Sequence, residues 1–146
     1  MKAKGGFTLV EILIVVVILG ILAAIVIPQF TEASTEARTS SLMSNLQTIR
    51  SQLELYAVQH NDDNPTLADF VAQMTGTTDI DGATTGTDFG PYLQQIPPNP
   101  FTNNNSVVAW DASTAASADG WEYNATTGEI RAAVDTTADT AAHQAL

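Results

Sequence analysis

Glu11 is the side chain whose chemistry is hardest to reconcile with its surroundings. Between Phe7 and Pro28 only Thr8 and Glu11 are polar, and residues 12–27 carry no polar side chain at all. A carboxylate at lipid depth is costly unless a cation pairs with it. Two interpretations stay open: Glu11 lies high enough to reach the headgroups, or its cationic partner comes from another molecule, since the helix itself offers none.

The other residues that could do chemistry give weaker signals. Neither His60 nor His143 has a nearby nucleophile or a partner at metal-ligand spacing. The acidic pairs Asp62-Asp63 and Asp79-Asp81 lack the later acids of an EF-hand, so solvated acidic loops are the favoured interpretation. No nucleophile elbow and no Gly-rich phosphate loop is present. The sequence therefore predicts that this protein is not an enzyme.

A membrane-spanning helix would position that carboxylate. As a helix, Phe7 to Ile27 spans roughly 31 Å at about 1.5 Å per residue, enough for a hydrocarbon core of about 30 Å. The leader Met1–Gly6 is too short for a secretory signal, and because it precedes the apolar run, cleavage after Gly6 would leave the anchor in place. Lys2 and Lys4 predict a cytoplasmic N-terminus and a head on the other side.

A second, amphipathic half is predicted to extend this helix beyond Pro28. No Gly or Pro occurs from Thr31 to His60, and large apolar residues recur there at spacings of four, three, four and three. This apolar stripe comprises Leu42, Leu46, Ile49, Leu53 and Tyr56, and Ala33 and Ala37 continue it backward. We expect the stripe to pack on the head, within one helix of roughly 50 residues.

The head begins where His60–Pro65 breaks the helix. A short second helix, ended by Gly76, is predicted next, with capping-box spacing between Thr66 and Asp69. A loop rich in Thr, Gly and Asp follows it, and three prolines within residues 97–100 exclude a helix or a central strand there. The apolar residues expected to hold this segment against the core are Tyr92, Leu93, Ile96 and Phe101.

The C-terminal part is predicted to form a small antiparallel sheet. Its candidate strands are 106–110, 120–124 and 129–134, with a hairpin turn between the last two. Alternation places Trp121 and Tyr123 on one face, opposite Ile130. The fold class expected is therefore α+β, with a long N-terminal helix, half membrane-spanning and half amphipathic, packed on that sheet.

Composition limits the partners. The chain has 146 residues and no Cys, enough for one small domain plus the N-terminal segment. Removal of a leader containing Lys2 and Lys4 leaves a net charge of −13, three positive against sixteen negative. Such a surface repels phosphates, so nucleic acid is not an expected partner. Copies that pack together need neutralisation, by cations or by pairing of Glu11.

The N-terminal residues also resemble a known signal. A short basic leader ending in Gly6, followed by Phe-Thr-Leu-Val-Glu and an unbroken apolar run, resembles the class III signal of type IV pilins and type II secretion pseudopilins. The resemblance implies cleavage after Gly6 by a prepilin peptidase and N-methylation of Phe7. It matches Glu11 to the family glutamate that pairs with the terminal amine of a neighbouring subunit. It also matches Pro28 to the family's helix-kinking proline, and with Gly20, which also disfavours helix, this predicts a helix that loosens as subunits leave the bilayer.

Two further features resemble the major pseudopilin of type II secretion systems. The segment Ile96–Pro100 is similar to a Pro-rich segment of that protein, and the absence of Cys departs from true pilins, which close a C-terminal loop with a disulfide. Major pseudopilins hold calcium in a C-terminal loop. Here Asp111, Asp119 and Glu122 are the acids suitably placed, but they do not match the family's ligand pattern, so no cofactor is predicted and calcium remains open.

We therefore expect a structural filament subunit, most similar to the major pseudopilin. The resemblance implies a helical homo-oligomer, an inner-membrane assembly platform, minor pilins or pseudopilins as partners, and a single-pass inner-membrane location before assembly into a periplasmic or extracellular filament. The expected segments are the leader 1–6, the transmembrane and assembly helix 7–30, the amphipathic half 31–60, the head 61–134 and a frayed tail 135–146. Two alternatives stay open: a true type IV pilin of an adhesion or motility pilus, and a membrane-tethered periplasmic binding or enzymatic domain.

Overall fold

The computed structural model describes residues 6–110 and 119–133. The chain divides into two units, Met1–Ala37 and Arg38–Leu146. Several residues on which the sequence predictions rest lie outside the described ranges: Lys2, Lys4, Asp111, Val134, His143 and the tail 135–146.

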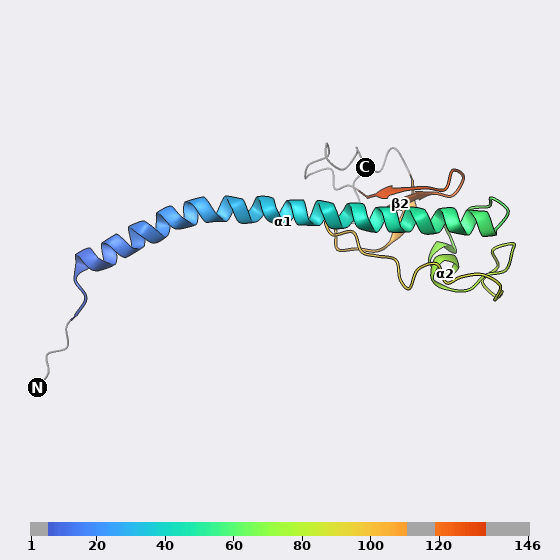
Figure 1. The fold of residues 1–146 in the computed structure, drawn as a ribbon, viewed down its shortest axis with the longest axis horizontal. Helices are drawn as coiled ribbons and strands as arrows, with labels where there is room; N and C mark the ends of the chain where they lie inside the picture. Colours follow the sequence, from blue (N-terminus) through green and yellow to red (C-terminus); the bar gives the residue numbers. More distant parts are fainter. Residues whose placement is uncertain (1–5, 111–118, 134–146) are drawn as a thin grey trace, which may run out of the picture. The chain divides into compact units, whose positions relative to one another are not determined.

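One helix, α1, runs from Leu9 to Gln59 over 51 residues and supplies both units (Figure 1). It stays helical through Pro28 and ends at the residue before His60. The predicted long helix is thereby confirmed. Its length follows from the sequence, because no second Pro and only one Gly interrupt it, and each peptide group finds its partner four residues away.

The predicted stripe of α1 forms the centre of the second unit, residues 38–146. From here on this whole unit, which includes the second half of α1, is called the head. The stripe members Leu42, Leu46, Ile49, Leu53 and Tyr56 are each at most 4% exposed. They pack with Trp121, Tyr123 and Ile130 in one hydrophobic cluster. Ala33 and Ala37, predicted to continue the stripe, are exposed instead. Spacing along a helix shows which face is apolar, but it does not show where the elements that cover this face end.

The sheet has three strands in the order β1-β2-β3. They are β1 Val107–Ala109, β2 Trp121–Asn124 and β3 Glu129–Ala132. β2 and β3 form the predicted antiparallel hairpin, in which Tyr123 lies opposite Ile130. The prediction that the sheet is antiparallel throughout is wrong, because β1 pairs with β2 in parallel. Eleven residues separate these two strands, which is long enough for the chain to return to the same end of the sheet.

The second helix, α2, is shorter than predicted and runs from Phe70 to Thr75. The predicted capping contacts are present: the Thr66 hydroxyl and Asp69 exchange two hydrogen bonds of 3.3 Å. They close a turn ahead of the helix instead of its first turn. The capping-box spacing therefore predicted the position of the turn that precedes α2. The helix α2 itself begins at the residue after Asp69.

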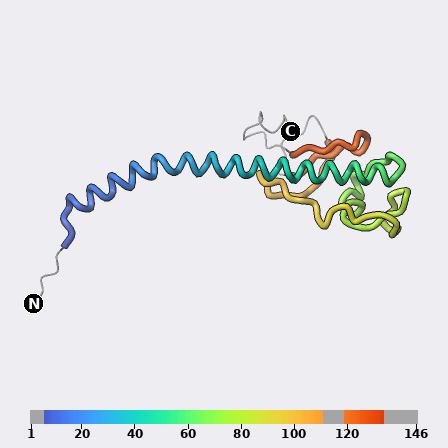
Figure 2. The backbone as a smooth tube through the Cα atoms, viewed as in Figure 1, coloured from blue at the N-terminus to red at the C-terminus, as the bar shows by residue number. Residues whose placement is uncertain are grey.

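The Pro-rich segment runs back along the head part of α1, as Figure 2 traces. At one end the Tyr92 hydroxyl donates to the Gln59 side-chain oxygen at 2.7 Å, and at the other Asn45 donates to the Pro98 carbonyl at 3.0 Å. Tyr92, Leu93 and Ile96 are buried and Phe101 is half-buried, which confirms that these residues hold the segment on the core. Prolines suit this place because the segment pairs through side chains and carbonyls rather than through a ladder of N–H groups.

Asn99, in the middle of the Pro-rich segment, joins it to the sheet. Its side chain is 1% exposed. The amide nitrogen donates to the carbonyls of Gly120 and Ala133, at 3.0 and 3.2 Å, just outside the ends of β2 and β3. The amide oxygen accepts from the Phe101 N–H at 3.0 Å. One buried amide therefore bonds three backbone groups, of which the Gly120 carbonyl also accepts from the Ala133 N–H at 3.1 Å.

We expect Asn99→Ala to destabilise the head by about 2 kcal/mol, because it removes the side-chain donor of the buried Ala133 carbonyl and one of the two donors of the Gly120 carbonyl. Chemical denaturation of the full chain in detergent, followed by near-ultraviolet circular dichroism, measures this. Asn105→Ala is the matched control, since Asn105 is exposed and makes one long bond of 3.4 Å to Ile96. Equal midpoints for the two variants would contradict the role of Asn99.

Candidate functional site

The first turn of α1 is closed by a reciprocal capping box. Thr8 precedes the helix, and Glu11 is its third residue. The Thr8 N–H and hydroxyl both donate to Glu11 Oε2 at 2.8 Å, and the Glu11 N–H faces the Thr8 hydroxyl oxygen at 3.3 Å. These contacts satisfy helix-terminal donors that have no partner inside the helix, and a negative charge in a first turn also suits the helix dipole.

The capping box leaves Glu11 partly satisfied. Both contacts reach Oε2, and within the described residues Oε1 has no hydrogen-bond partner and no cation forms an ion pair with this carboxylate. The chain thus fixes the position of Glu11 but does not neutralise it. One oxygen and a full negative charge remain available to a cation from another molecule.

The apolar half of α1 has no cover from its own chain. From Phe7 to Ile27 the large apolar side chains are all exposed, and Phe7 reaches 83%. In the part of the chain that the structure describes, α1 is the one helix long and apolar enough to cross a membrane. A helix that is apolar on every side is not stable when water surrounds it, so lipid or other helices must cover it.

The predicted processing and kink residues lie along this exposed segment. Side-chain atoms added at Gly6 or Gly20 would meet nothing within 4 Å. Neither glycine is therefore required by packing within the described residues. Pro28 lacks an N–H, so the carbonyl of Ala24 loses its helical partner. The Thr31 hydroxyl donates to the Ile27 carbonyl at 3.2 Å and supports the turn after Pro28.

His60 has a structural position in the head. It is 1% exposed and stacks on Tyr56 with ring centroids 3.8 Å apart. Its Nδ1 lies 2.8 Å from the Tyr56 carbonyl, which can only accept, so Nδ1 carries the proton. Nε2 then accepts from the Thr78 hydroxyl at 2.9 Å when the ring is neutral. Both ring nitrogens are thereby used, which leaves none for a metal or a substrate.

Two of the three acids considered for calcium are engaged elsewhere. Glu122 is 3% exposed and forms an ion pair of 2.5 Å with Arg131, its cross-strand partner. The guanidinium of Arg131 lies 4.1 Å from the centre of the Trp110 ring. Asp119 accepts from the Ser106 hydroxyl at 2.9 Å, and Asp111 lies outside the described residues. The described residues contain no group of three metal-ligating side chains.

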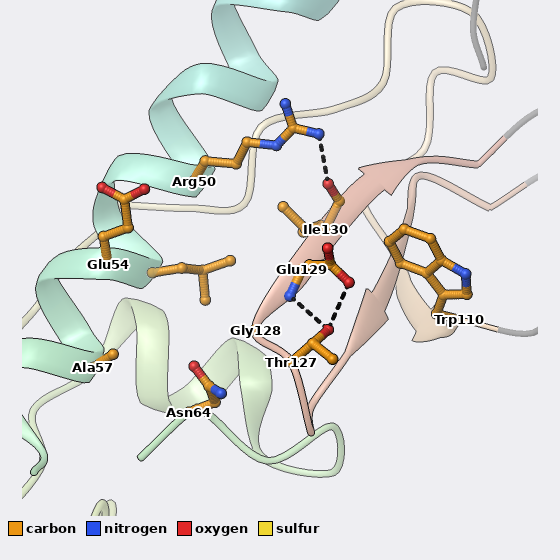
Figure 3. A pocket seen from close by; sticks show the side chains of 10 residues that line it. Arg50, Glu54, Ala57, Asn64, Trp110, Thr127, Gly128, Glu129 and Ile130 are labelled. Carbon is orange, nitrogen blue, oxygen red and sulfur yellow. Dashed lines mark hydrogen bonds between the residues drawn. The ribbon is translucent and has the colours of Figure 1, made fainter. Parts of the chain in front are cut away.

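An open groove of about 370 Å³ lies between α1 and the β2–β3 hairpin (Figure 3). Arg50 reaches across it and donates to the Ile130 carbonyl at 3.1 Å, which ties the edge of β3 to the helix. On the opposite wall the Thr127 hydroxyl donates to Glu129 at 2.8 Å. Arg50 therefore holds the hairpin on α1, and the Thr127 and Glu129 side chains bond to each other within the hairpin.

Sequence reasoning missed two features of these sites. Sequence reasoning gave Thr8 no role of its own, although Thr-X-X-Glu ahead of an apolar run is the sequence pattern of a capping box. The pairs Asp62-Asp63 and Asp79-Asp81 were interpreted as separate acidic loops. Asp62, Asp63 and Asp81 line one pocket, and no sequence pattern shows that these loops meet.

The geometry defines a class of protein. A long N-terminal helix with an uncovered apolar half, a fixed carboxylate in its first turn and a small α+β head together form a pilin-like architecture. Residues 1–27 match the family described as "Prokaryotic N-terminal methylation motif".

Relatives along most of the chain narrow the class. The type II secretion system core protein G of Pseudomonas aeruginosa is 31% identical over 108 residues, which cover 74% of this chain and 75% of the relative. The protein of the same name from Klebsiella pneumoniae is 26% identical over 109 residues, or 75% and 77% of the two chains. This chain belongs to the family of type II secretion system core protein G, and it is a structural subunit and not an enzyme.

The chain is also similar to a second kind of protein, over a shorter stretch. A fimbrial protein of Pseudomonas aeruginosa is 43% identical over 54 residues, which cover 37% of this chain and 35% of that protein. No solved structure matches the chain.

We expect Thr8→Ala to open the first turn of α1, because the side chain that accepts and donates in the capping box is lost. The Glu11 amide, which donates to the Thr8 hydroxyl oxygen, should then exchange with deuterium about fivefold faster. Hydrogen exchange on the full chain in detergent micelles measures this. Thr8→Ser keeps the hydroxyl and should exchange like the parent. Identical protection in Thr8→Ala would show that the capping box does not stabilise this turn.

Proposed function

We propose that this protein is the repeating subunit of a type II secretion pseudopilus. The likeness to core protein G over three quarters of the chain, together with the N-terminal methylation motif, carries this proposal. The subunit is cleaved after Gly6, methylated on the new N-terminus of Phe7, anchored in the membrane by α1 and then polymerised. The experiment that tests it is deletion of the gene. Exoproteins should then accumulate inside the cell envelope, and the intact gene should restore their release.

In this proposal Glu11 selects the register of the filament. Cleavage creates a terminal amine on Phe7, which carries a positive charge four residues from Glu11 in sequence. The amine of one copy meets the Oε1 side of Glu11 in the next, while Thr8 holds Oε2. Pairing removes one charge of each sign from the apolar filament core, where each would be costly alone.

In this proposal Gly20 and Pro28 let α1 change shape during assembly. A subunit leaving the bilayer exchanges lipid for the helices of other copies, so its helix has to adapt to a new surface. Gly20 stabilises helix less than other residues, and Pro28 removes one hydrogen bond. Both residues lower the cost of local rearrangement. The inner-membrane assembly platform, minor pseudopilins and a head on the periplasmic side complete the proposed arrangement, and the leader lysines favour this orientation.

The shorter likeness to a fimbrial protein favours a second candidate function, an extracellular pilus for adhesion or motility. The same deletion separates the two. A pseudopilus subunit is required for protein release, whereas a pilus subunit is required for surface fibres and surface motility with protein release unchanged.

We expect Gly6→Leu to block processing, because it adds bulk at the residue before the cleaved bond, where an added Cβ now meets no other atom within 4 Å. The mass of the membrane-bound protein should then include the six leader residues and lack the added methyl group. Ala23→Leu, which adds similar bulk inside the apolar run, should be processed normally. A shortened, methylated Gly6→Leu protein would place the cleavage site elsewhere.

We expect Glu11→Ala to be inserted and cleaved but not assembled, because the neighbouring amine would enter the filament core unpaired. The yield of sheared filaments, relative to protein in the membrane, should fall more than about 100-fold. Glu32→Ala removes an exposed acid from the same helix beyond Pro28 and should assemble. Normal filaments from Glu11→Ala would contradict the pairing.

A further inference from the structure

The pattern Asn-X-Ser/Thr, which is the attachment signal for N-linked sugars, begins at three residues of the chain: Asn64, Asn104 and Asn124. The first is excluded because its middle residue is Pro65. The pattern is short enough to arise by chance, but the fold uses the side chains of the other two sites differently. A transferase needs two groups: the amide nitrogen, which becomes bonded to the sugar, and the hydroxyl two residues later.

The triplet Asn124-Ala125-Thr126 lies at the tip of the β2–β3 hairpin (Figure 3). Asn124 is the last residue of β2 and is half-buried, and residues 125–127 of the turn are exposed. The Gly128 N–H donates to the Asn124 carbonyl at 2.8 Å, so the backbone closes the turn. This triplet therefore belongs to a short turn that faces solvent.

The turn uses the side-chain oxygen of Asn124. This oxygen accepts from the Thr126 N–H at 2.9 Å and from the Thr127 N–H at 3.3 Å. Because both neighbours donate, the amide atom that faces them is the oxygen. An aspartate would accept the same two bonds, so the turn itself does not require the amide nitrogen.

The amide nitrogen of Asn124 is available to a reaction partner. Within the described residues Nδ2 has no hydrogen-bond partner. The buried side-chain atom without a partner in this part of the chain is Thr102 Oγ1. The unpartnered Nδ2 of Asn124 is therefore not a buried atom, and solvent reaches it.

The hydroxyl of Thr126 is also unused by the fold. Thr126 is exposed, and in the described part of the chain its hydroxyl has no hydrogen-bond partner. The neighbouring Thr127 differs, because its hydroxyl donates to the Glu129 carboxylate at 2.8 Å. One exposed turn thus presents both groups that a transferase needs.

The triplet at Asn104 is held by the fold instead. The Ser106 hydroxyl donates to Asp119 at 2.9 Å and accepts from the Gly120 N–H at 3.2 Å. The Asn104 backbone pairs with Asn99 in a β-bridge. These contacts join the segments that precede β1 and β2, so a transferase could engage this hydroxyl only by opening them.

We propose that Asn124 is an N-glycosylation site and that Asn104 is not. The substrate class is an oligosaccharide linked to a lipid through pyrophosphate. Nδ2 of Asn124 forms a bond to the anomeric carbon of the first sugar, and the bond from that carbon to the phosphate oxygen breaks. The lipid pyrophosphate leaves with the bonding electrons, and Nδ2 loses one proton. This rests on the proposed function, because the transfer takes place on a head that has crossed the membrane.

Mass spectrometry of the full chain, purified from its own cells, tests this site. Digestion after glutamate releases residues 123–129, which contain Asn124, and residues 55–122, which contain Asn104. Each triplet is therefore measured in a separate peptide. The peptide 123–129 should carry a sugar chain that survives mild alkali, since its linkage is an amide. Asn104 in the other peptide should be unmodified.

Substitutions separate the attachment signal from the structure of the turn. Asn124→Asp keeps an oxygen for both N–H donors, so the hairpin should fold, and the sugar should be lost completely. Thr126→Ala should also lose it, and Thr126→Ser should keep it. Thr127→Ala is the matched control, because it removes a neighbouring hydroxyl outside the triplet and should leave the sugar in place.

Three results would overturn this inference alone: an unmodified peptide 123–129 from protein that has lost its leader, a sugar on that peptide that mild alkali removes, and a sugar on Asn104. Removal by alkali would show linkage to a hydroxyl. An unmodified peptide from protein that still carries its leader would overturn the proposed processing together with this inference.

Discussion

The apolar half of α1 must be covered by something outside its own chain, and the rest of the molecule depends on this constraint. Apart from the Ala24 carbonyl opposite Pro28, its backbone groups beyond the first turn are satisfied inside the helix, so lipid can cover the side chains of a single copy. Other copies can cover the same surface, because helices that are apolar on all sides pack on one another as readily as on lipid tails. A surface that accepts both environments allows one segment to be an anchor first and a filament core later.

The first turn of α1 makes the replacement of lipid by other copies specific. An apolar surface alone does not define register, since it offers no directional contact. Thr8 fixes the Glu11 carboxylate through two donors to the same oxygen, and the charge is left without a cation in the described chain. A fixed and uncompensated charge in apolar surroundings favours the one arrangement that brings a cation to it.

The head shows how an acidic chain uses few cations. The negative charge of Glu122 is buried in the sheet. It is stabilised there because the guanidinium of Arg131 pairs with it and stacks on the Trp110 ring. Arg50 fastens the free edge of β3 to α1, which also protects that edge from pairing with another chain. Fifteen acids belong to the rest of the chain beyond Glu11. Within the described residues five of them are exposed outside helices and strands, where like charges cost little until copies approach: Asp62, Asp63, Asp69, Asp81 and Asp88.

The sequence by itself determined the elements that depend on local pattern. An unbroken apolar run of sufficient length and a 3–4 spacing from Leu42 to Tyr56 specify α1 and its buried face, because helical periodicity is a property of neighbouring residues. Tertiary structure alone decided the parallel pairing of β1, the anchoring by Asn99, and the meeting of Asp63 with Asp81 beside the Tyr56 hydroxyl. These depend on contacts between residues far apart in sequence, and alternation or composition carries no information about which distant segments meet or in which direction they run.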